Sequence, residues 1–400
     1  MARFQPFEER HRLAVAVSGG NDSMALLKLA DLWVKARGGN LTAFHVDHGL
    51  RTESSQEAIQ VKTWAEALDI PCSILKWTHG PISSRIQQKA RDARYQLLLG
   101  ACKEEKILHL LVAHHRDDDL ETLQIRQEAQ SGEWGLAGMA ACQEFESVRI
   151  LRPLLDFTKE ELRQVLGNHP HVEDPSNENL RFRRVQLRQK KEFFEDSLLE
   201  TLGTYKVQRQ EQEGFLLGAM SVYVSFFKEG YAVLDPRFMA ALPPSLSLKL
   251  LGYTLRCMGG LEYLPRQEAL QRALTKLEKS LSATCGGCQL KFIGGKILVI
   301  REARAKPVLI SSQTPFLWDK RFWIENISEK AVGLEVGRLG PQGWLQVKKD
   351  IPISTSSMIA QTFPTLWRGG GTVEVPFFSK EPLIKVCFRP RNSLLASLFV

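Results

Sequence analysis

The sequence predicts an α/β protein whose N-terminal part is a doubly wound parallel sheet. Three observations support this fold class. Short β-branched or apolar runs alternate with longer helical patterns between residues 13 and 166, as in βαβ units. The apolar spacing is then mostly helical from 192 to 280, and the remainder of the chain favours strands. We therefore expect an α-rich domain and a small C-terminal α+β domain after the parallel sheet.

Five strands are expected in the first domain, and each is a short apolar or β-branched run: Leu13–Val17, Leu41–Asp47, Cys72–Trp77, Ile107–Ala113 and Val148–Leu151. The segments between them are long enough for crossover helices, the clearest of which spans Arg85–Glu104. The uncharged stretch Gly214–Phe227 is too short to cross a bilayer as a helix, so we expect a buried helix there. Gln289–Arg301 alternates like a hairpin around Gly294-Gly295.

The length of 400 residues predicts two or three domains at roughly 150 residues each. We place the boundaries at 1–195 for a nucleotide-binding catalytic domain, 196–304 for the α-rich domain and 308–400 for the C-terminal domain. The turn-prone sequence Ala305-Lys306-Pro307 serves as the linker before the last of these.

The composition excludes several classes of protein. Hydrophobic residues make up 44% and charged residues 24%, close to globular averages, which argues against disorder and fibrous repeats. A net charge of +8 favours a polyanionic partner. Seven sparse cysteines suit a reducing compartment, and the N-terminus has no secretory apolar region. We therefore expect a cytoplasmic protein that does not associate with a membrane.

The strongest motif is Ser18-Gly19-Gly20-Asn21-Asp22-Ser23, between the first strand and the following helix. A glycine turn at a helix N-terminus presents unpaired N–H groups to an anion, so these six residues predict a phosphate site. The Walker A lysine pattern is absent. An ordinary capped strand-to-helix turn is the alternative interpretation of the same residues.

Two further segments lie at strand ends that meet this turn in an open α/β sheet. The first is His45-Val46-Asp47-His48, where backbone groups could hold an adenine base; capping or core histidines are the alternative. The second runs from His114 to Thr122 and contains His115, Asp117, Asp118 and Glu121. Its carboxylates could bind Mg²⁺ or the ammonium groups of lysine. The alternative is an acidic helix N-terminus that complements the helix dipole.

Basic residues form the candidate RNA contacts. Arg91 and Arg94 lie three residues apart on one expected helix face and suit either pyrophosphate or an RNA phosphate. The tract 174–191 combines an Asn/Pro loop with clustered cations. Its candidate residues, together with one from the C-terminal domain, are Asn177, Arg181, Arg184, Arg188 and Arg321. A solvated basic face, or core packing for Arg321, is the alternative.

The hexapeptide resembles the signature of the PP-loop ATP pyrophosphatase superfamily, and further motifs resemble the tRNA(Ile)-lysidine synthetase family. These motifs stand in the family's order: His45–Arg51, Ala90–Tyr95, His114–Thr122, Gly135–Met139, Arg152–Leu155 and Asp174–Asn177. The resemblance implies that the wobble cytidine of a CAU-anticodon isoleucine tRNA is adenylated by ATP, and that free L-lysine then displaces AMP. ATP and Mg²⁺ are the implied cofactors, and a homodimer is compatible with the resemblance.

The resemblance also implies roles for individual residues. The implied catalytic residues are Asp22, Arg94, Asp117 and Asp118. ATP would be bound by the six residues 18–23 with Val46 and His48, and lysine by His115, Asp118 and Glu121. Asp22 and Asp117 are the candidate Mg²⁺ ligands.

The chain departs from the family's pattern at two places. The usual Arg-Asn-Arg-Ile-Arg reads Arg184-Val-Gln-Leu-Arg188, and the usual Ala-Asp-Asp-Gln reads Arg116-Asp-Asp-Asp119. Two other functions are weighed against the ligase. A PP-loop tRNA thiolase generally needs a catalytic cysteine or an iron–sulfur cluster, and only Cys142 stands near the expected crevice. A non-catalytic tRNA-binding module with a degenerate ATP loop is the other alternative.

Overall fold

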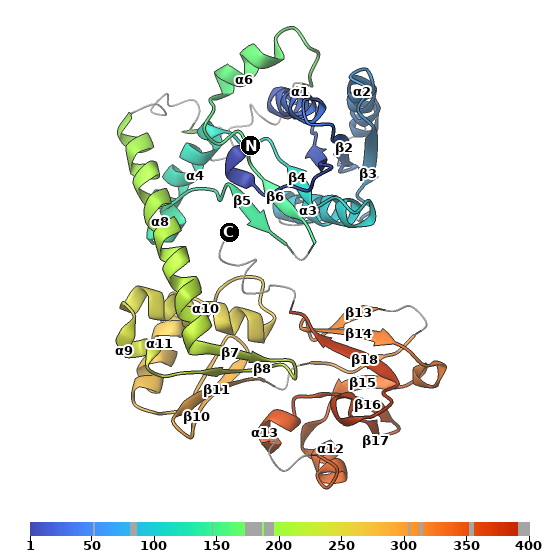
Figure 1. Cartoon of the computed structure of the whole chain (residues 1–400), viewed down its shortest axis with the longest axis vertical. Helices are drawn as coiled ribbons and strands as arrows, with labels where there is room; N and C mark the ends of the chain where they lie inside the picture. Colours follow the sequence, from blue (N-terminus) through green and yellow to red (C-terminus); the bar gives the residue numbers. More distant parts are fainter. Residues whose placement is uncertain are drawn as a thin grey trace. The chain divides into compact units, whose positions relative to one another are not determined.

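The computed structural model describes residues 1–50, 53–80, 86–145, 147–172, 186–187, 196–302, 305–311, 315–351 and 356–390. The chain forms two compact units, one running from Met1 to Glu211 and the other beginning at Gln212 (Figure 1). Helix α8 (Asp196–Tyr223) contributes to both. The division into three domains at 195 and 308 stays a prediction.

The first unit is built on a six-stranded sheet with the order β3-β2-β1-β4-β6-β5. Its strands are β1 (Arg12–Ala16), β2 (Asn40–Asp47), β3 (Cys72–Lys76), β4 (His109–Leu111), β5 (Cys142–Glu144) and β6 (Arg149–Leu151). All pairs are parallel except β5 with β6. The five expected strands and the doubly wound sheet are confirmed. The antiparallel edge strand β5 was not expected, because three residues with one apolar side chain show no alternation.

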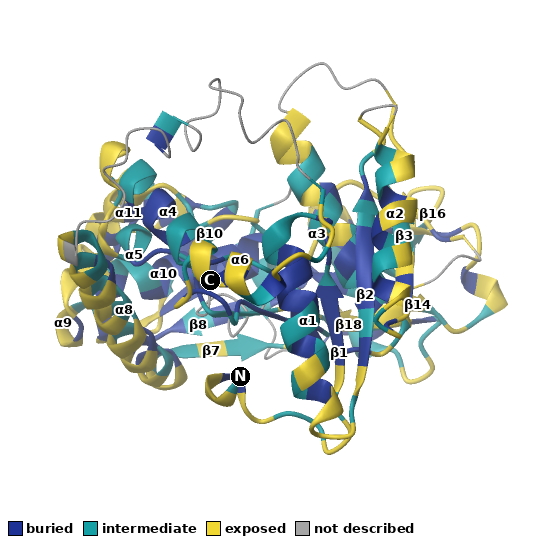
Figure 2. Cartoon of the chain, turned by 90° about the horizontal axis from the view of Figure 1, so that it is seen from above, coloured by how far each residue is buried: buried dark blue, intermediate teal, exposed yellow. Residues whose placement is uncertain are grey.

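Helices cover both faces of this sheet (Figure 1). They are α1 (Asn21–Lys35), α2 (Ser54–Glu66), α3 (Ile86–Glu104), α4 (Arg116–Glu128), α5 (Glu133–Leu136) and α6 (Lys159–Leu166). Buried side chains of α1, α2 and α6 pack on one face in a single cluster, and α3 packs on the other. Their outer faces are exposed, as the yellow outer surface of α2 in Figure 2 illustrates.

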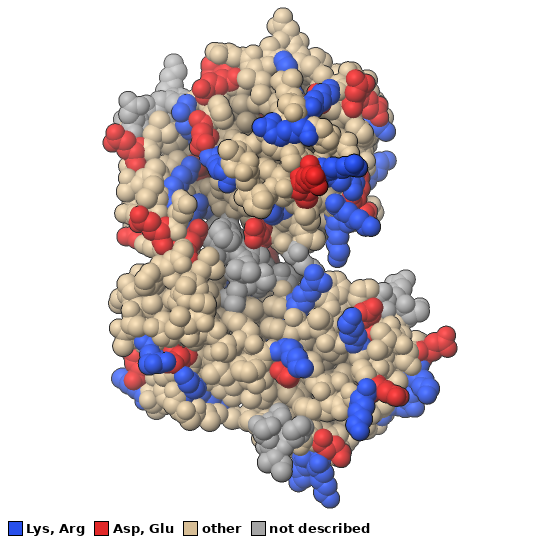
Figure 3. Space-filling model, in the orientation of Figure 1, with Lys and Arg blue, Asp and Glu red and all other residues tan. Residues whose placement is uncertain are grey.

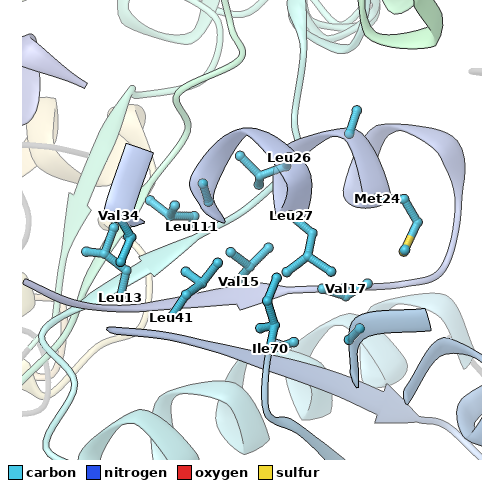
Figure 4. Close-up of a cluster of buried hydrophobic side chains, with 14 of the residues drawn as sticks. Leu13, Val15, Val17, Met24, Leu26, Leu27, Val34, Leu41, Ile70 and Leu111 are labelled. Carbon is cyan, nitrogen blue, oxygen red and sulfur yellow. The ribbon is translucent and has the colours of Figure 1, made fainter. Parts of the chain in front are cut away.

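Strand β1 lies at the centre of the core because its side chains are apolar on both faces. Leu13, Val15 and Val17 point to the cluster around Leu27 of α1 (Figure 4), whereas Ala14 belongs to the opposite cluster. A continuous run of buried apolar side chains is typical of a central parallel strand, because such a strand is covered on both faces. The carboxyl end of this buried strand therefore holds the Ser18–Ser23 turn on a rigid support.

The second unit contains three sheets. The first has the order β7-β8-β11-β10-β9 and is packed with helices: β7 (Val224–Phe227), β8 (Tyr231–Leu234), β9 (Ala283–Cys285), β10 (Cys288–Ile293), β11 (Lys296–Arg301), α9 (Phe238–Ala241), α10 (Pro244–Gly259) and α11 (Gln267–Glu278). The β10–β11 hairpin is confirmed. The buried helix expected over Gly214–Phe227 is wrong in part, because the helix ends at Tyr223 and Phe215 is 55% exposed.

The other two sheets form the C-terminal part. Their strands are β12 (Val308–Leu309), β13 (Phe316–Trp318), β14 (Phe322–Asn326), β15 (Glu335–Arg338), β16 (Pro364–Arg368), β17 (Gly371–Glu374) and β18 (Ile384–Phe388), with helices α12 (Gly340–Val347) and α13 (Ser357–Ala360). Strands and short helices together confirm the expected α+β character. Within the described ranges, every helix is too short or too polar to cross a membrane.

Candidate active site

The turn between β1 and α1 is closed by Ser23. Its hydroxyl donates to the carbonyl of Gly20 at 2.9 Å and accepts the backbone N–H of Ser18 at 3.2 Å. Gly20 is the N-cap of α1 and adopts an extended conformation. The first N–H groups of α1 have no partner in the helix, so this end of α1 can bind an anion.

Gly19 is the residue that this turn requires to be glycine. Its φ is +90°, and a Cβ atom there would lie 2.5 Å from Cγ2 of Val61. The carbonyl of Gly19 accepts the N–H of Val172 at 2.8 Å. A side chain at Gly19 would therefore strain the backbone and push apart the neighbours that hold the turn.

His115 gathers three carboxylates from two helices. Its Nε2 lies 3.5 Å from Oδ2 of Asp22 and 3.5 Å from Oδ2 of Asp118, and its Nδ1 lies 3.8 Å from Oδ2 of Asp117. The imidazole is 2% exposed. His115 is the N-cap of α4, and its backbone N–H donates to Asp118 at 3.2 Å. The structure thus brings Asp22, His115, Asp117 and Asp118 together, as the sequence motifs suggested.

The pKa values of this cluster reflect burial opposed by charge pairing. Burial alone would lower the pKa of His115, but its hydrogen bond with Asp22 and the surrounding carboxylates raise it above its ordinary value. Burial would likewise raise the pKa of Asp22, and the contact with His115 instead holds it below the usual range. The contact between the two side chains therefore favours the protonated form of His115 and the ionised form of Asp22.

Lys159 is a neighbour of this cluster that the sequence motifs did not indicate. Its backbone N–H donates to Oδ2 of Asp117 at 3.1 Å, and its charge helps to lower the pKa of Asp22. Lys159 is the first residue of α6, directly after the N-cap Thr158. The signal available in the sequence was the capping box formed by Thr158 and Glu161, which places Lys159 at a helix start.

The region after β2 holds His48 and Arg94. Burial lowers the pKa of His48, and the charge of Arg94 on α3 lowers it further. The guanidinium of Arg94 lies 5.8 Å from the ring centroid of Tyr95, and that of Arg91 lies 5.2 Å from it. Val46 belongs to β2, beside these residues. The end of β2 therefore carries a half-buried imidazole whose lowered pKa favours the neutral form.

Two predicted site residues are enclosed. Glu121 is 0% exposed, one helical turn beyond Asp118. Arg321 is 1% exposed; it donates to Asp319 at 2.6 Å and to the carbonyl of Gly230 at 3.0 Å. The prediction that Arg321 contacts RNA is therefore wrong. Its buried guanidinium is hydrogen-bonded to Asp319 and to the carbonyl of Gly230, so it cannot reach an RNA phosphate. Four other predicted RNA contacts lie outside the described residues: Asn177, Arg181, Arg184 and Arg188.

Comparison with known proteins decides the family. Residues 1–191 match the model of a PP-loop domain family. The chain is 34% identical to the tRNA(Ile)-lysidine synthase of Wolbachia pipientis wMel over 78% of this chain and 76% of that protein. The chain belongs to the tRNA(Ile)-lysidine synthase family. It is also 32% identical to the tRNA(Ile)-lysidine synthase of Ruegeria pomeroyi, over 91% of this chain and 88% of that protein. It is 29% identical to the tRNA(Ile)-lysidine synthase of Orientia tsutsugamushi, over 94% of this chain and 91% of that protein.

The two departures of this tRNA(Ile)-lysidine synthase family member at the start of α4 both form ion pairs. Arg116, where the family usually has Ala, lies 3.7 Å from Glu161 of α6. Asp119, where the family usually has Gln, lies 2.7 Å from Nζ of Lys206 on α8. The pair of Arg116 with Glu161 is partly exposed and contributes little to the free energy of unfolding. In the pair of Asp119 with Lys206, the carboxylate is fully buried.

Proposed function

We propose that this protein ligates L-lysine to the wobble cytidine of a CAU-anticodon isoleucine tRNA in an ATP-dependent reaction. The observation that carries the proposal is the His115 cluster, which joins Asp22 of the glycine turn to the carboxylates of α4. Membership of the tRNA(Ile)-lysidine synthase family supports the identity of both substrates. The expected products are lysidine-containing tRNA, AMP and pyrophosphate.

ATP is placed on the glycine turn. The N–H groups at the start of α1 are available to its phosphates, whereas the hydroxyl of Ser18 donates to that of Ser23 at 3.2 Å. The match to a PP-loop domain supports this assignment. Backbone groups of Val46 and His48 at the end of β2 are proposed to hold the adenine. Lys159 is proposed to contact the phosphates, because its charge already acts on Asp22.

Adenylation makes the carbonyl oxygen of cytidine a good leaving group. The bond from that oxygen to the α-phosphorus forms as the bond to pyrophosphate breaks. The protein must orient the two reactants and neutralise the charge that accumulates on pyrophosphate. We assign the second task to the start of α1, Lys159 and Arg94.

We propose that Mg²⁺ binds the carboxylates of this site. Oδ1 of Asp117 is buried and has no hydrogen-bond partner among the described residues, and Asp22 lies at the other ring nitrogen of His115. Magnesium is commonly held by one or two carboxylates and substrate phosphates, so Asp22 and Asp117 are the proposed ligands. The ion would neutralise phosphate charge when bound.

Lysine is proposed to bind beside α4. A carboxylate is the group that recognises an ammonium, and Asp118 is 13% exposed whereas Glu121 is enclosed. We therefore assign the lysine contact to Asp118, oriented by His115, and give Glu121 a supporting place behind it. The ε-amine must be deprotonated when it attacks C2 of the adenylated cytidine and displaces AMP.

RNA contacts are proposed for Arg91 and for the four residues outside the described ranges. On the face drawn in Figure 3, Lys and Arg side chains are interspersed with Asp and Glu over both units. On that face, the described basic side chains are therefore spread over both units rather than gathered over one element. We also propose a cytoplasmic location, where tRNA and ATP are found, and a homodimer to be tested by light scattering.

The thiolase alternative is not favoured. Cys142, the cysteine nearest the expected crevice, lies on β5, and burial raises the pKa of its thiol above the ordinary value. A nucleophilic cysteine needs a lowered thiol pKa, so Cys142 is poorly suited to sulfur transfer. The experiment that separates the functions supplies ATP, Mg²⁺, the tRNA and radiolabelled lysine to the purified protein. ATP-dependent label in the RNA supports the ligase, and pyrophosphate release without label would exclude lysine as the nucleophile.

A further inference from the structure

The end of α5 and the loop that follows it, residues Gly135–Ala140, are held beside α4 by three arginines. Nη1 of Arg126 donates to the carbonyls of Gly135 at 2.5 Å and Gly138 at 3.1 Å. Arg209 of α8 also donates to Gly138 at 3.3 Å, and Arg152 donates to the carbonyl of Ala140 at 2.7 Å. Charged donors make stronger bonds to carbonyls than neutral donors do. Hydrogen bonds from arginine side chains to backbone carbonyls therefore hold this segment in place.

Asp119 holds the same loop through an N–H group. Its Oδ1 accepts the backbone N–H of Met139 at 2.5 Å, and its Oδ2 lies 2.7 Å from Nζ of Lys206. The carboxylate is 0% exposed, whereas Lys206 is 31% exposed. Gly138 has φ +65°, and a Cβ there would lie 2.3 Å from Oδ1 of Asp119. The glycine thus leaves the space that this carboxylate occupies.

Asp119 belongs to the same helical turn as the proposed catalytic carboxylates. Asp117 and Asp118 precede it in α4, and the N–H of Asp119 donates to the carbonyl of His115 at 3.3 Å. One turn of helix moves as a unit, because its backbone hydrogen bonds fix the residues relative to one another. Anchoring Asp119 on the inner side of the turn therefore fixes the side that carries His115 and the other two carboxylates.

We propose that Asp119, neutralised by Lys206, is a positioning residue that sets the orientation of the first turn of α4 toward lysine. This inference rests on the proposed function for the identity of the ligand. A Gln at this position would offer Met139 a neutral carbonyl oxygen and would need no cation. This chain has a buried carboxylate instead, and Lys206 supplies the charge that a buried carboxylate requires.

The pair predicts an asymmetry between its two members. Lys206→Met removes the ion-pair partner of a carboxylate that stays buried, whereas Asp119→Gln frees a partly exposed ammonium that can turn to solvent. We therefore expect Lys206→Met to lower the melting temperature more than Asp119→Gln does. The double variant Asp119→Gln/Lys206→Met should be more stable than Lys206→Met alone. Additive losses in this double-mutant cycle would overturn the pairing.

The positioning role is tested by kinetics of lysine incorporation. For Asp119→Ala and Lys206→Met we expect the KM for lysine to rise about tenfold and the KM for ATP to change less than about threefold, because the phosphates bind mainly to α1. Adding Asp119→Gln to Lys206→Met should return the lysine KM to within about threefold of wild type. Lys35→Met, which breaks the exposed pair with Asp31, is the matched control and should leave both KM values unchanged.

A purely structural role would give a different result: activity would fall with the folded fraction while both KM values stayed at wild type. That result would overturn the proposal. A readout independent of catalysis is the NMR signal of the His115 imidazole, assigned by its loss in His115→Gln. We expect Asp119→Ala to shift it and Lys35→Met to leave it in place. If wild type attaches no lysine, the proposed function fails, and an unshifted imidazole signal would still separately overturn the positioning role.

Discussion

Nε2 of His115 lies 3.5 Å from Oδ2 of Asp22, so a buried imidazole at the start of α4 reaches the first turn of α1. The two helices follow neighbouring strands, β1 and β4, whose carboxyl ends meet at one edge of the sheet. The contact joins the element proposed to bind phosphates to the element proposed to bind lysine.

Replacing Asp22 tests the acidic side of this contact. Asp22→Asn keeps the shape of the side chain but removes the charge that pairs with His115 and is proposed to bind Mg²⁺. We expect kcat/KM for lysine incorporation to fall about 100-fold or more, with the melting temperature nearly unchanged. Asp31→Asn, which removes the charge that pairs with the exposed Lys35 in the same helix, is the control. Equal activity of the two variants would remove Asp22 from the mechanism.

Replacing Gly19 tests the turn itself. Ala at this position combines a φ of +90° with a Cβ 2.5 Å from Val61, so Gly19→Ala should cost about 1–3 kcal/mol of unfolding free energy and weaken ATP binding. Gly100→Ala in α3 is the matched control, because no atom lies within 4 Å of its Cβ and Ala favours a helix. Urea unfolding should show opposite signs for the two changes. A stable Gly19→Ala that binds ATP normally would contradict the geometry of the turn.

The pH dependence of stability should include a contribution from His45. Its Nδ1–H donates to the carbonyl of Val17 at 2.9 Å, and burial lowers its pKa below the ordinary value of about 6.5. The unfolded chain therefore binds the proton first as the pH falls, so stability is full above the unfolded pKa and decreases below it. His45→Gln should lose less stability than wild type between about pH 7.5 and pH 5 in urea titrations. A parallel decline in both proteins would show that His45 is not the titrating group.

Cysteine labelling should separate buried from exposed thiols. Burial raises the pKa of the Cys257 and Cys288 thiols to about 12, whereas Cys387 is exposed on β18. Because the thiolate is the reactive species, iodoacetamide should label Cys387 well before the other two in the native protein. Mass spectrometry of peptides reads out the order, and urea should abolish it. Early labelling of Cys288 would contradict its packing.

Local pattern was enough to predict the sheet and the glycine turn. The continuous apolar run of β1 and the apolar runs of the other strands are patterns that depend only on residues close together in the sequence. The carboxylate cluster was also predictable in outline, because residues that follow β1 and β4 must meet at one edge. What the motifs could not show was that His115 stands between the carboxylates, since that depends on the register of two helices distant in sequence.

The residues whose surroundings the sequence patterns did not predict depend on tertiary contacts. Arg321 stands among aromatic side chains, which is equally typical of an RNA-binding surface and of a core, and only the carbonyl of Gly230 and the buried Asp319 decide between them. Lys159 acts on Asp22 because α6 packs on α1, which no local signal indicates. The pairing of Asp119 with Lys206 likewise joins α4 to α8.

Analysis of the wobble nucleoside after reaction tests the proposed ligation of lysine to the tRNA most directly. The purified protein is incubated with ATP, Mg²⁺, lysine and CAU-anticodon isoleucine tRNA, and the tRNA is digested to nucleosides for mass spectrometry. We predict that cytidine at the wobble position is converted to lysidine only when ATP, lysine and an intact Asp22 are all present. Unmodified cytidine in the complete reaction, or a modified nucleoside formed without lysine, would contradict it.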